Sequence, residues 1–496
     1  MQISLRFQLF AITCFLMASF SIAYLSDVMT IWNGAESSFL YGLQNGENPG
    51  YLPYLINHFL ATEAGAISTT ARLLGLSVLT ISLAFFFFSS KILIGTKTAL
   101  ITVLISIAGF FLPVLAKVAT SDIWLFGFQL MAYTAMLRFL KKPDILFRSL
   151  FYLWLAGAVL IQPLSTLIIF MGSPAFIYLM GKDRKALLRL NPWLAVIVLA
   201  LLFHFTGFLY WDNDTFIFNT LHFAYGKFLL LAIIGILPFF GYFLGALRDM
   251  AFKLKHREEL SILFVPVVLF SIIAQSPLIA FGIAFLIAKQ MILYTNDKYP
   301  FGNWIKTGAV INLTLSFFVA IFLMLRGLQE FGGIGFRVGL GFSIAYWSLG
   351  VAAIIGLFTK DKRLLWGAAI LNGLMSFLIL ASAVYPLIET KRDVSRRLFA
   401  EIGNNPYIER VILSEKPPIR RKKMPLLAQQ HFEKLQIDST RDFQAIYDNA
   451  SPKTLIIFKQ MPPDSGLLRK YPDLIHVEGW DDHFRNVEWC GVVVSH

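Results

Sequence analysis

Residues 73–94 read LLGLSVLTISLAFFFFSSKILI, an apolar run whose single charged residue, Lys91, lies near its end. A helix needs about 20 mostly apolar residues to cross a bilayer, so this run predicts a membrane-spanning helix. Similar windows recur along residues 1–388 and predict about thirteen spans in all. They lie near residues 5–25, 73–94, 98–116, 122–140, 148–163, 164–180, 193–211, 227–247, 260–276, 277–295, 305–326, 335–358 and 364–388. The pairs that meet at 162–163 and at 276–277 fit either tight hairpins or broken helices.

The composition agrees with an all-α polytopic membrane protein. Of the 496 residues, 57% are hydrophobic and 15% are charged, whereas soluble domains usually carry about 25% charged residues. A single globular core stops growing at about 250–300 residues, so it cannot hide this much apolar surface. This excludes an ordinary cytosolic enzyme, a disordered scaffold and a disulfide-stapled secreted module. The two cysteines, Cys14 and Cys490, offer no metal-ligand spacing and no disulfide framework.

The basic residues follow the predicted topology. Cytoplasmic loops carry an excess of Lys and Arg, and with the N-terminus inside every second loop is basic. These basic loops lie near residues 91–97, 138–148, 182–189, 248–257, 298–306 and 360–363. The first opposite loop carries Asp27, Glu36, Glu47 and Glu63 instead. The net charge of +13 therefore reflects membrane topology and does not indicate a nucleic-acid partner.

Residues 389–496 differ in composition from the rest of the chain. Strand-like runs at 454–458 and 492–494, a helical pattern near 425–436 and Pro-rich turns predict a small soluble α/β domain. An odd number of spans places this domain outside the cytoplasm. Its basic run at 420–423 is interpreted as a solvated or membrane-hugging turn, with a lipid-phosphate role as the alternative.

Residues 26–72 form the longest predicted connection between spans, far longer than the usual 4–6 residues or so. Apolar residues recur in it at helical spacing, which predicts short amphipathic helices that lie in the membrane interface. It is expected on the outer side.

Two carboxylates on this predicted outer side are candidates for chemistry. Glu36 follows the first span, and Asp122 ends the segment KVATSD, residues 117–122, at the mouth of the fourth span. If they share a cavity, they suit a general base or a divalent cation such as Mg²⁺ or Mn²⁺. In the alternative interpretation Glu36 faces water, and Asp122 with Ser121 caps a helix.

The layout resembles the GT-C superfamily of lipid-phosphate-sugar-dependent glycosyltransferases. Within it the chain is most similar to the aminoarabinose transferase and protein O-mannosyltransferase-like (family 39-like) branch. The segments that carry the resemblance are 117–122, Ala71-Arg72-Leu73-Leu74, Gly157 through Pro163, and Ser276-Pro277-Leu278. The resemblance implies a GT-C-like membrane domain over residues 1–388, a periplasmic or extracytoplasmic domain over 389–496, and a bacterial inner (plasma) membrane.

The chain also departs from the motifs of that family. The usual Asp-Glu pair reads Ala35-Glu36, and the usual cation before Pro53 is missing. The family's Lys near the end of the fifth span corresponds to Gln162, and nothing charged stands at Ser276-Pro277. These changes remove three cations of the kind that favours phosphate binding.

The resemblance implies an inverting transfer of a sugar from a polyprenyl-phosphate-linked donor to a lipid, glycan or protein acceptor. In that mechanism Glu36 deprotonates the acceptor, Arg72 and Lys117 bind the donor phosphate, and Asp122 positions the acceptor or helps to hold the divalent cation. Membrane lipids are the other expected partners. The lost cations leave open a catalytically diverged protein that binds a lipid-linked glycan or joins a membrane complex. A transporter or flippase is disfavoured, because no two-half symmetry is visible in the sequence.

Overall fold

The computed structural model divides the chain into two compact units. Residues 1–27 and 48–384 form the membrane unit, and residues 28–47 and 385–496 form the C-terminal unit. The structure describes residues 4–24, 67–181, 184–206, 225–294, 302–359, 361–392, 410–414, 435–438, 448–460, 475–480 and 486–494, and single residues at 36, 39, 40, 43, 56 and 408. Most of the predicted first outer loop, 26–72, lies outside these residues.

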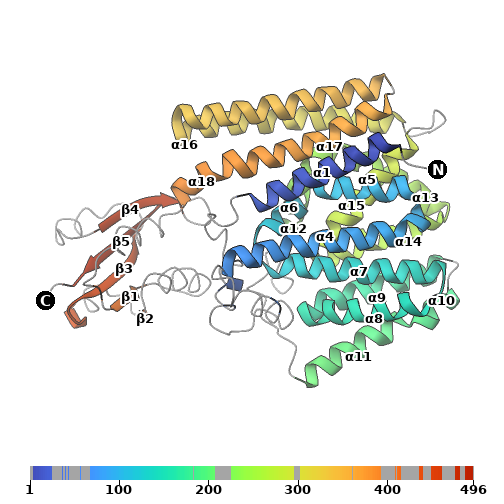
Figure 1. Cartoon of the computed structure of the whole chain (residues 1–496), viewed down its shortest axis with the longest axis horizontal. Helices are drawn as coiled ribbons and strands as arrows, with labels where there is room; N and C mark the ends of the chain where they lie inside the picture. The colour runs from blue at the N-terminus through green and yellow to red at the C-terminus, as the bar shows by residue number, and fades with distance from the viewer. Residues whose placement is uncertain are drawn as a thin grey trace. The chain divides into compact units, whose positions relative to one another are not determined.

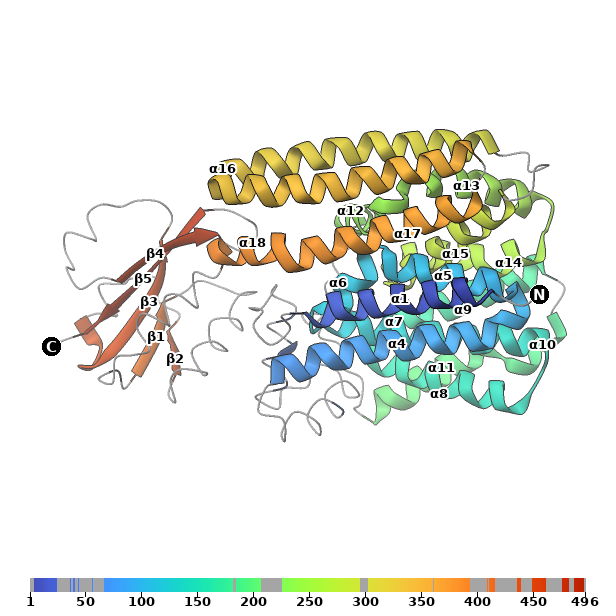
Figure 2. The same ribbon diagram turned by 45° about the horizontal axis from the view of Figure 1, so that its top comes forward.

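The membrane unit is built from helices that lie side by side (Figures 1 and 2). In chain order they are α1 (Leu5–Ala23), α4 (Ile67–Ile94), α5 (Thr96–Ala108), α6 (Phe111–Lys117), α7 (Ser121–Lys141), α8 (Ile145–Ile161), α9 (Pro163–Met180), α10 (Arg184–Leu190), α11 (Pro192–Phe205), α12 (Tyr225–Gly235), η2 (Leu237–Phe239), α13 (Phe240–Lys255), α14 (Glu259–Ile273), α15 (Leu278–Leu293), α16 (Gly302–Phe358), α17 (Lys362–Ile379) and the π-helical turn η3 (Leu380–Val384). The chain is therefore an integral membrane protein with helical spans.

Among the described residues, seven helices are long and apolar enough to cross a membrane, or nine when each of two bent pairs counts as one span. Three shorter apolar helices, α8, α14 and α15, coincide with further predicted windows. The two predicted spans at 305–326 and 335–358 correspond to the two helical halves of α16, which are separated at Gly332, where the backbone is non-helical with φ 61°. The two halves pack against each other, and the Ser343 hydroxyl donates to the carbonyl of Ala320. The count of thirteen spans stays a prediction.

Two predicted details of the membrane unit are wrong. The first loop does not extend to residue 72, because α4 begins at Ile67. The spans predicted at 98–116 and 227–247 are each broken, with a bend of 60° between α5 and α6 and of 64° between α12 and the segment that starts at Leu237. The two breaks meet, since the backbone N–H of Phe110 donates to the carbonyl of Gly235 over 2.7 Å.

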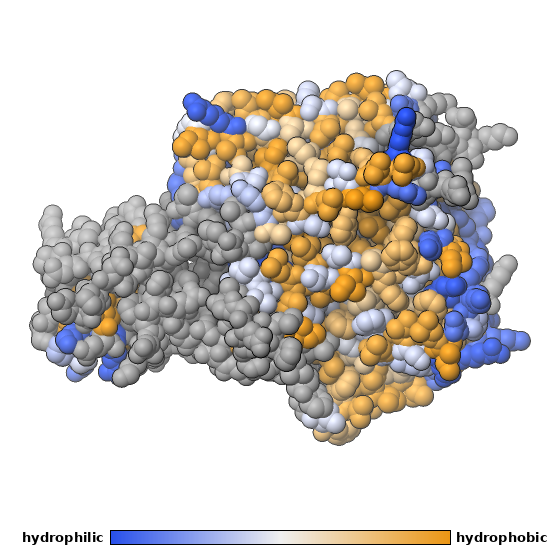
Figure 3. Space-filling model, viewed as in Figure 1, coloured by the Kyte–Doolittle hydropathy of each residue, from blue (hydrophilic) through white to orange (hydrophobic). Residues whose placement is uncertain are grey.

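Polar side chains gather at the end of the membrane unit where Figure 1 labels α10 and α13 (Figure 3). The last turns of α4, α7 and α13 contribute Lys91, Arg138, Lys141, Lys253 and Lys255. Apolar side chains cover the helices over much of the remaining surface in this view. This distribution fits a helical unit surrounded by lipid, with charged helix ends at one membrane surface.

Helix α7 occupies the centre of the membrane unit. In its apolar window 89% of the residues are buried, a larger share than in the other candidate spans. The Tyr133 hydroxyl donates to the carbonyl of Leu263 in α14, which ties the two helices together. Side chains that project from α7 are therefore surrounded by protein along most of its length.

The C-terminal unit contains helix α18 (Tyr385–Arg392) and a five-stranded sheet in the order β2-β1-β3-β5-β4. The strands are β1 (Arg410–Ser414), β2 (Leu435–Asp438), β3 (Thr454–Gln460), β4 (Ile475–Trp480) and β5 (Asn486–Val493). β1 pairs in parallel with β2 and β3, and β5 pairs antiparallel with β3 and β4. The strand runs predicted at 454–458 and 492–494 are confirmed in β3 and, up to Val493, in β5. The helical pattern near 425–436 lies outside the described residues up to 434, and residues 435–438 form a strand instead.

Helices α13 and α16 pack backbone to backbone at Gly241 and Gly308. A methyl group added to Gly308 would overlap the carbonyl oxygen of Gly241, and one added to Gly241 would overlap that of Gly308. Glycine at both positions is therefore a packing requirement.

We expect Gly308→Ala to lower the melting temperature of the purified protein in detergent, because overpacking costs about 1–3 kcal/mol or more. Gly341→Ala, in the second helical half of α16, is the matched control, because no atom lies within 4 Å of its added methyl group. Alanine there should leave stability unchanged or raise it by up to about 1 kcal/mol. Equal melting temperatures for the two variants would contradict the close approach of α13 and α16.

Candidate functional site

The N-terminal turn of α7 buries a carboxylate. Thr120 is the extended N-cap residue, and Ser121 and Asp122 follow in the first turn. All three are fully buried, with Asp122 at 0% exposure. Thr120 holds the N-cap position and its side chain makes no capping hydrogen bond, so the alternative that Ser121 and Asp122 cap the helix stays open. A helix N-terminus carries partial positive charge, and the Asp122 carboxyl lies in this first turn.

Lys117 ends α6 and caps another helix. Its Nζ donates to the backbone carbonyls of Ser21, Ile22 and Tyr24 at 3.3, 3.2 and 2.6 Å. These carbonyls belong to the last turn of α1, which has no further helical N–H to accept. A cation at a helix C-terminus is also favoured by the helix dipole. Lys117 is 5% exposed. Three of its hydrogen bonds stabilise the C-terminal end of α1.

Arg72 lies inside α4 and is 1% exposed. The contacts of Gly75, one turn later in α4, show which residues lie near this part of the helix. A methyl group on Gly75 would lie 3.2 Å from the carbonyl oxygen of Ala116 and 3.4 Å from Cγ2 of Ile123. The turn that follows Arg72 therefore packs against the residues beside Lys117 and Asp122. Arg72 therefore lies one turn before the point where α4 contacts the junction of α6 and α7, which carries Lys117 and Asp122.

Glu36 belongs to the C-terminal unit. It is 0% exposed, and Phe39, Leu40 and Leu43 are buried with it. The spacing of these four residues is that of one face of a helix, as the sequence predicts. The alternative in which Glu36 faces water is wrong. A buried carboxylate is costly unless it is paired, so this one has a structural or chemical role.

The predicted divalent cation site rests on two carboxylates, those of Glu36 and Asp122. Among them, no group of three or more His, Cys, Asp or Glu side chains is placed to hold a metal ion. Asp122 belongs to the membrane unit, and Glu36, the other predicted ligand, belongs to the C-terminal unit. The Mg²⁺ or Mn²⁺ assignment therefore stays a prediction.

A buried network that the sequence did not predict ties two hairpins to α7. Gln129 donates through Nε2 to the hydroxyls of Ser165 and Thr166, both at 3.3 Å, and accepts a hydrogen bond from the Ser276 hydroxyl. All four side chains are fully buried. They join the start of α9, just after Gln162, and the turn between α14 and α15 to the central helix. The only signal in the sequence is their polarity within apolar windows.

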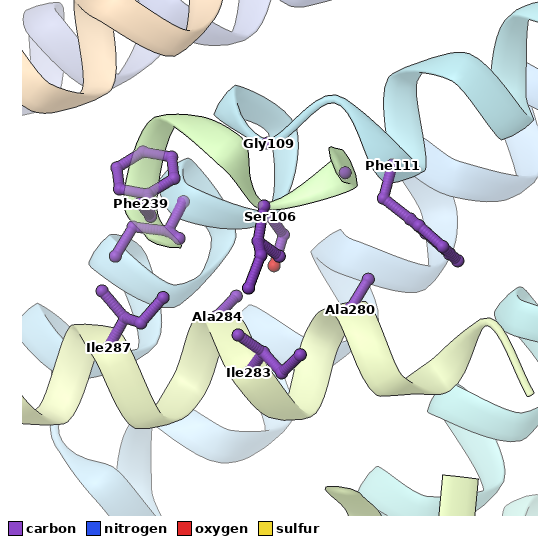
Figure 4. A pocket seen from close by; sticks show the side chains of 11 residues that line it. Ser106, Gly109, Phe111, Phe239, Ala280, Ile283, Ala284 and Ile287 are labelled. Atoms are coloured by element: carbon purple, nitrogen blue, oxygen red, sulfur yellow. The ribbon is translucent and has the colours of Figure 1, made fainter. Parts of the chain in front are cut away.

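A small cavity lies where the two helix breaks meet α15 (Figure 4). Its lining includes Gly109, Gly235, Ala280 and Ile283, with Ser106 as a polar member. The Ser106 hydroxyl donates to the carbonyl of Thr102. The cavity holds about 10 Å³, which is at the lower limit for one water molecule. It does not accommodate a sugar.

No protein-family model and no curated protein matches the sequence. The structure is similar to the crystal structure of ArnT from Cupriavidus metallidurans bound to undecaprenyl phosphate, with a TM-score of 0.66 at 14% identity and 97% coverage of each chain. The apo structure of the same protein matches with a TM-score of 0.63 at 12% identity, also over 97% of each chain. At this identity the likeness concerns the fold. The chain therefore has the fold of ArnT, a GT-C aminoarabinose transferase, as the resemblance of its sequence motifs predicts.

Proposed function

We propose that this protein transfers a sugar from a polyprenyl-phosphate-linked donor to a lipid, glycan or protein acceptor at the outer face of the membrane. The fold supports the reaction class, and the ArnT structure with undecaprenyl phosphate supports the class of donor lipid. The single observation that carries the proposal for this chain is the buried group formed by Arg72, Lys117 and Asp122. Charged side chains inside a membrane protein are costly and usually serve a function.

The proposed reaction is one inverting displacement. The acceptor hydroxyl gives its proton to Glu36, its oxygen bonds to the anomeric carbon, and the bond from that carbon to the phosphate oxygen breaks. The leaving group is the polyprenyl phosphate, which gains negative charge. General base catalysis of this kind contributes about 10²–10⁴-fold. The assignment of Glu36 rests on its sequence position and its burial.

Arg72 is the proposed phosphate ligand. A guanidinium binds phosphate oxygens through two parallel N–H donors, and such charge-assisted hydrogen bonds are among the strongest in proteins. The ammonium of Lys117 donates to three backbone carbonyls of α1. Lys117 can bind the same phosphate only if some of these hydrogen bonds break. Asp122 is proposed to orient the acceptor.

The proposal places the protein in a bacterial inner membrane, with the N-terminus cytoplasmic and residues 389–496 extracytoplasmic. The gathering of basic helix ends at one end of the membrane unit supports this orientation. A fusion of alkaline phosphatase after residue 496 would test it.

A second candidate function is binding of a lipid-linked glycan without transfer. One observation favours it, namely the engagement of Lys117 with α1, which leaves Arg72 as the principal phosphate ligand in this group. If the purified protein binds undecaprenyl-phosphate sugars but transfers none of them, this second function is correct and the transferase function is not.

We expect Glu36→Gln to reduce transfer by about 10²-fold or more, because it removes the base and keeps the shape of the side chain. The assay uses purified protein and a panel of undecaprenyl-phosphate sugars with envelope acceptors. Glu330→Gln, which removes a carboxylate paired with Arg326, is the control and should transfer normally. Wild-type transfer by Glu36→Gln would remove Glu36 from the mechanism.

Arg72→Gln should weaken binding of undecaprenyl phosphate by about 10- to 100-fold, the range expected for lost hydrogen bonds to a charged group. Arg72→Lys keeps the charge but loses the paired donors, so its loss should be smaller. The affinities are measured by titration of the purified variants, with melting temperatures as a folding check. Equal affinity of wild type and Arg72→Gln would exclude the phosphate assignment.

Two variants separate the roles of Lys117. Lys117→Met leaves the α1 carbonyls without their cap and should lower the melting temperature, since buried unsatisfied groups cost about 1–3 kcal/mol each. Lys117→Arg keeps the charge and five donors, and should retain more stability than Lys117→Met. If Lys117→Met keeps full thermal stability and loses only donor binding, Lys117 is a phosphate ligand and its cap on α1 is incidental.

A further inference from the structure

Helix α14 ends in a Schellman motif whose left-handed position is occupied by Gln275 and not by glycine. The N–H of Ser276 donates to the carbonyl of Ser271, and the N–H of Gln275 donates to that of Ile272. Gln275, just after the C-cap residue Ala274, has φ 48°. This left-handed position usually holds glycine, because a side chain there meets the backbone.

The same motif occurs at the end of α13. There Arg257 has φ 52°, and the N–H groups of Arg257 and Glu258 donate to the carbonyls of Leu254 and Lys253. The two positions have the same backbone but opposite surroundings. Arg257 is exposed, so its long side chain reaches solvent, whereas Gln275 is only 2% exposed.

Gln275 combines a strained backbone conformation with a side-chain amide that lacks a hydrogen-bond partner among the described residues. Its Nε2 is buried and has no hydrogen-bond partner within the described part of the chain. A buried donor without a partner is rare and destabilising. Glycine would remove both costs at this position. An acceptor that the described residues do not supply would account for a glutamine at this position.

The neighbours of Gln275 locate that acceptor. Ser276 bonds to Gln129, which lies seven residues after Asp122 in α7. Seven residues are close to two full turns, so Gln129 and Asp122 share a face about 10 Å apart. Thr120, at the start of the same helix, also has a buried hydroxyl oxygen without a partner. These polar groups lie on the side of the membrane unit that carries the candidate site.

We propose that the Gln275 amide is a specificity-determining group, which donates a hydrogen bond to an oxygen in the polar head of the lipid-linked donor. A sugar hydroxyl and a phosphate oxygen offer the same acceptor chemistry. A neutral amide suits either oxygen and adds no charge to the interior of the membrane unit. The inference rests on the proposed function and extends it to a residue outside the group of Arg72, Lys117 and Asp122.

The test measures stability and binding in the same full-length variants. Gln275→Gly should keep or raise the melting temperature, because glycine adopts the left-handed conformation freely, and should weaken donor binding about five- to tenfold, as expected for one lost hydrogen bond. Gln275→Leu removes the amide and keeps the volume. Arg257→Gly relieves the same backbone conformation at an exposed site and should leave binding unchanged.

Two probes identify the acceptor. If Gln275→Gly weakens binding of both undecaprenyl phosphate and an undecaprenyl-phosphate hexose, the amide binds a phosphate oxygen. If it weakens only the hexose ester, the amide binds a sugar hydroxyl. Wild-type affinity of both variants for both probes would overturn the inference and leave the proposed function intact. Failure of the wild-type protein to bind either probe would overturn both.

Discussion

The absence of water from the bilayer core is the constraint on which the rest of this structure depends. Every polar group in the membrane unit must find its partner within the protein, because lipid offers none. Lys117 meets this requirement for the last carbonyls of α1, and Gln129 meets it for hydroxyls on α9 and the α14–α15 turn. Both side chains join elements that are distant in sequence, so pairing of polar groups also fixes the arrangement of the helices.

The sequence predicted the spans well, because hydrophobicity over 20 residues is a local property. Windows such as 122–140 and 164–180 coincide with α7 and α9 to within a few residues. The breaks at Gly109 and Gly235 were not predicted. Each depends on the backbone of the other, as the hydrogen bond from Phe110 to Gly235 shows, and no local pattern encodes that contact. The two spans predicted at 305–326 and 335–358 correspond to the two helical halves that meet at Gly332 in α16.

The assignment of the candidate site stays a prediction. Its charged residues stand out in the sequence because charges are few on the predicted outer side, and in the fold Gly75, one turn after Arg72, packs against Ala116 and Ile123, the neighbours of Lys117 and Asp122. The capping role of Lys117 was not predictable, since it depends on where α1 ends, 93 residues earlier along the chain. The burial of Gln275 was hidden for another reason. A glutamine at a helix end usually faces solvent, and only the packing of the hairpin against α7 shows that this one does not.

This chain lacks cations at positions where the GT-C branch that its sequence resembles carries them. Gln162 and Ser276 stand at two of these positions, and both are buried. The Ser276 hydroxyl is bound to Gln129, so it holds a hairpin in place and contributes no charge to a ligand. As the donor's bond to phosphate breaks, the leaving group gains negative charge that must be stabilised by what remains. Under the proposed function, and with Lys117 bonded to α1, that stabilisation would fall chiefly to Arg72. Neutral donors such as Gln275 would then be the groups left to orient the donor, and recognition would depend less on charge and more on hydrogen bonding.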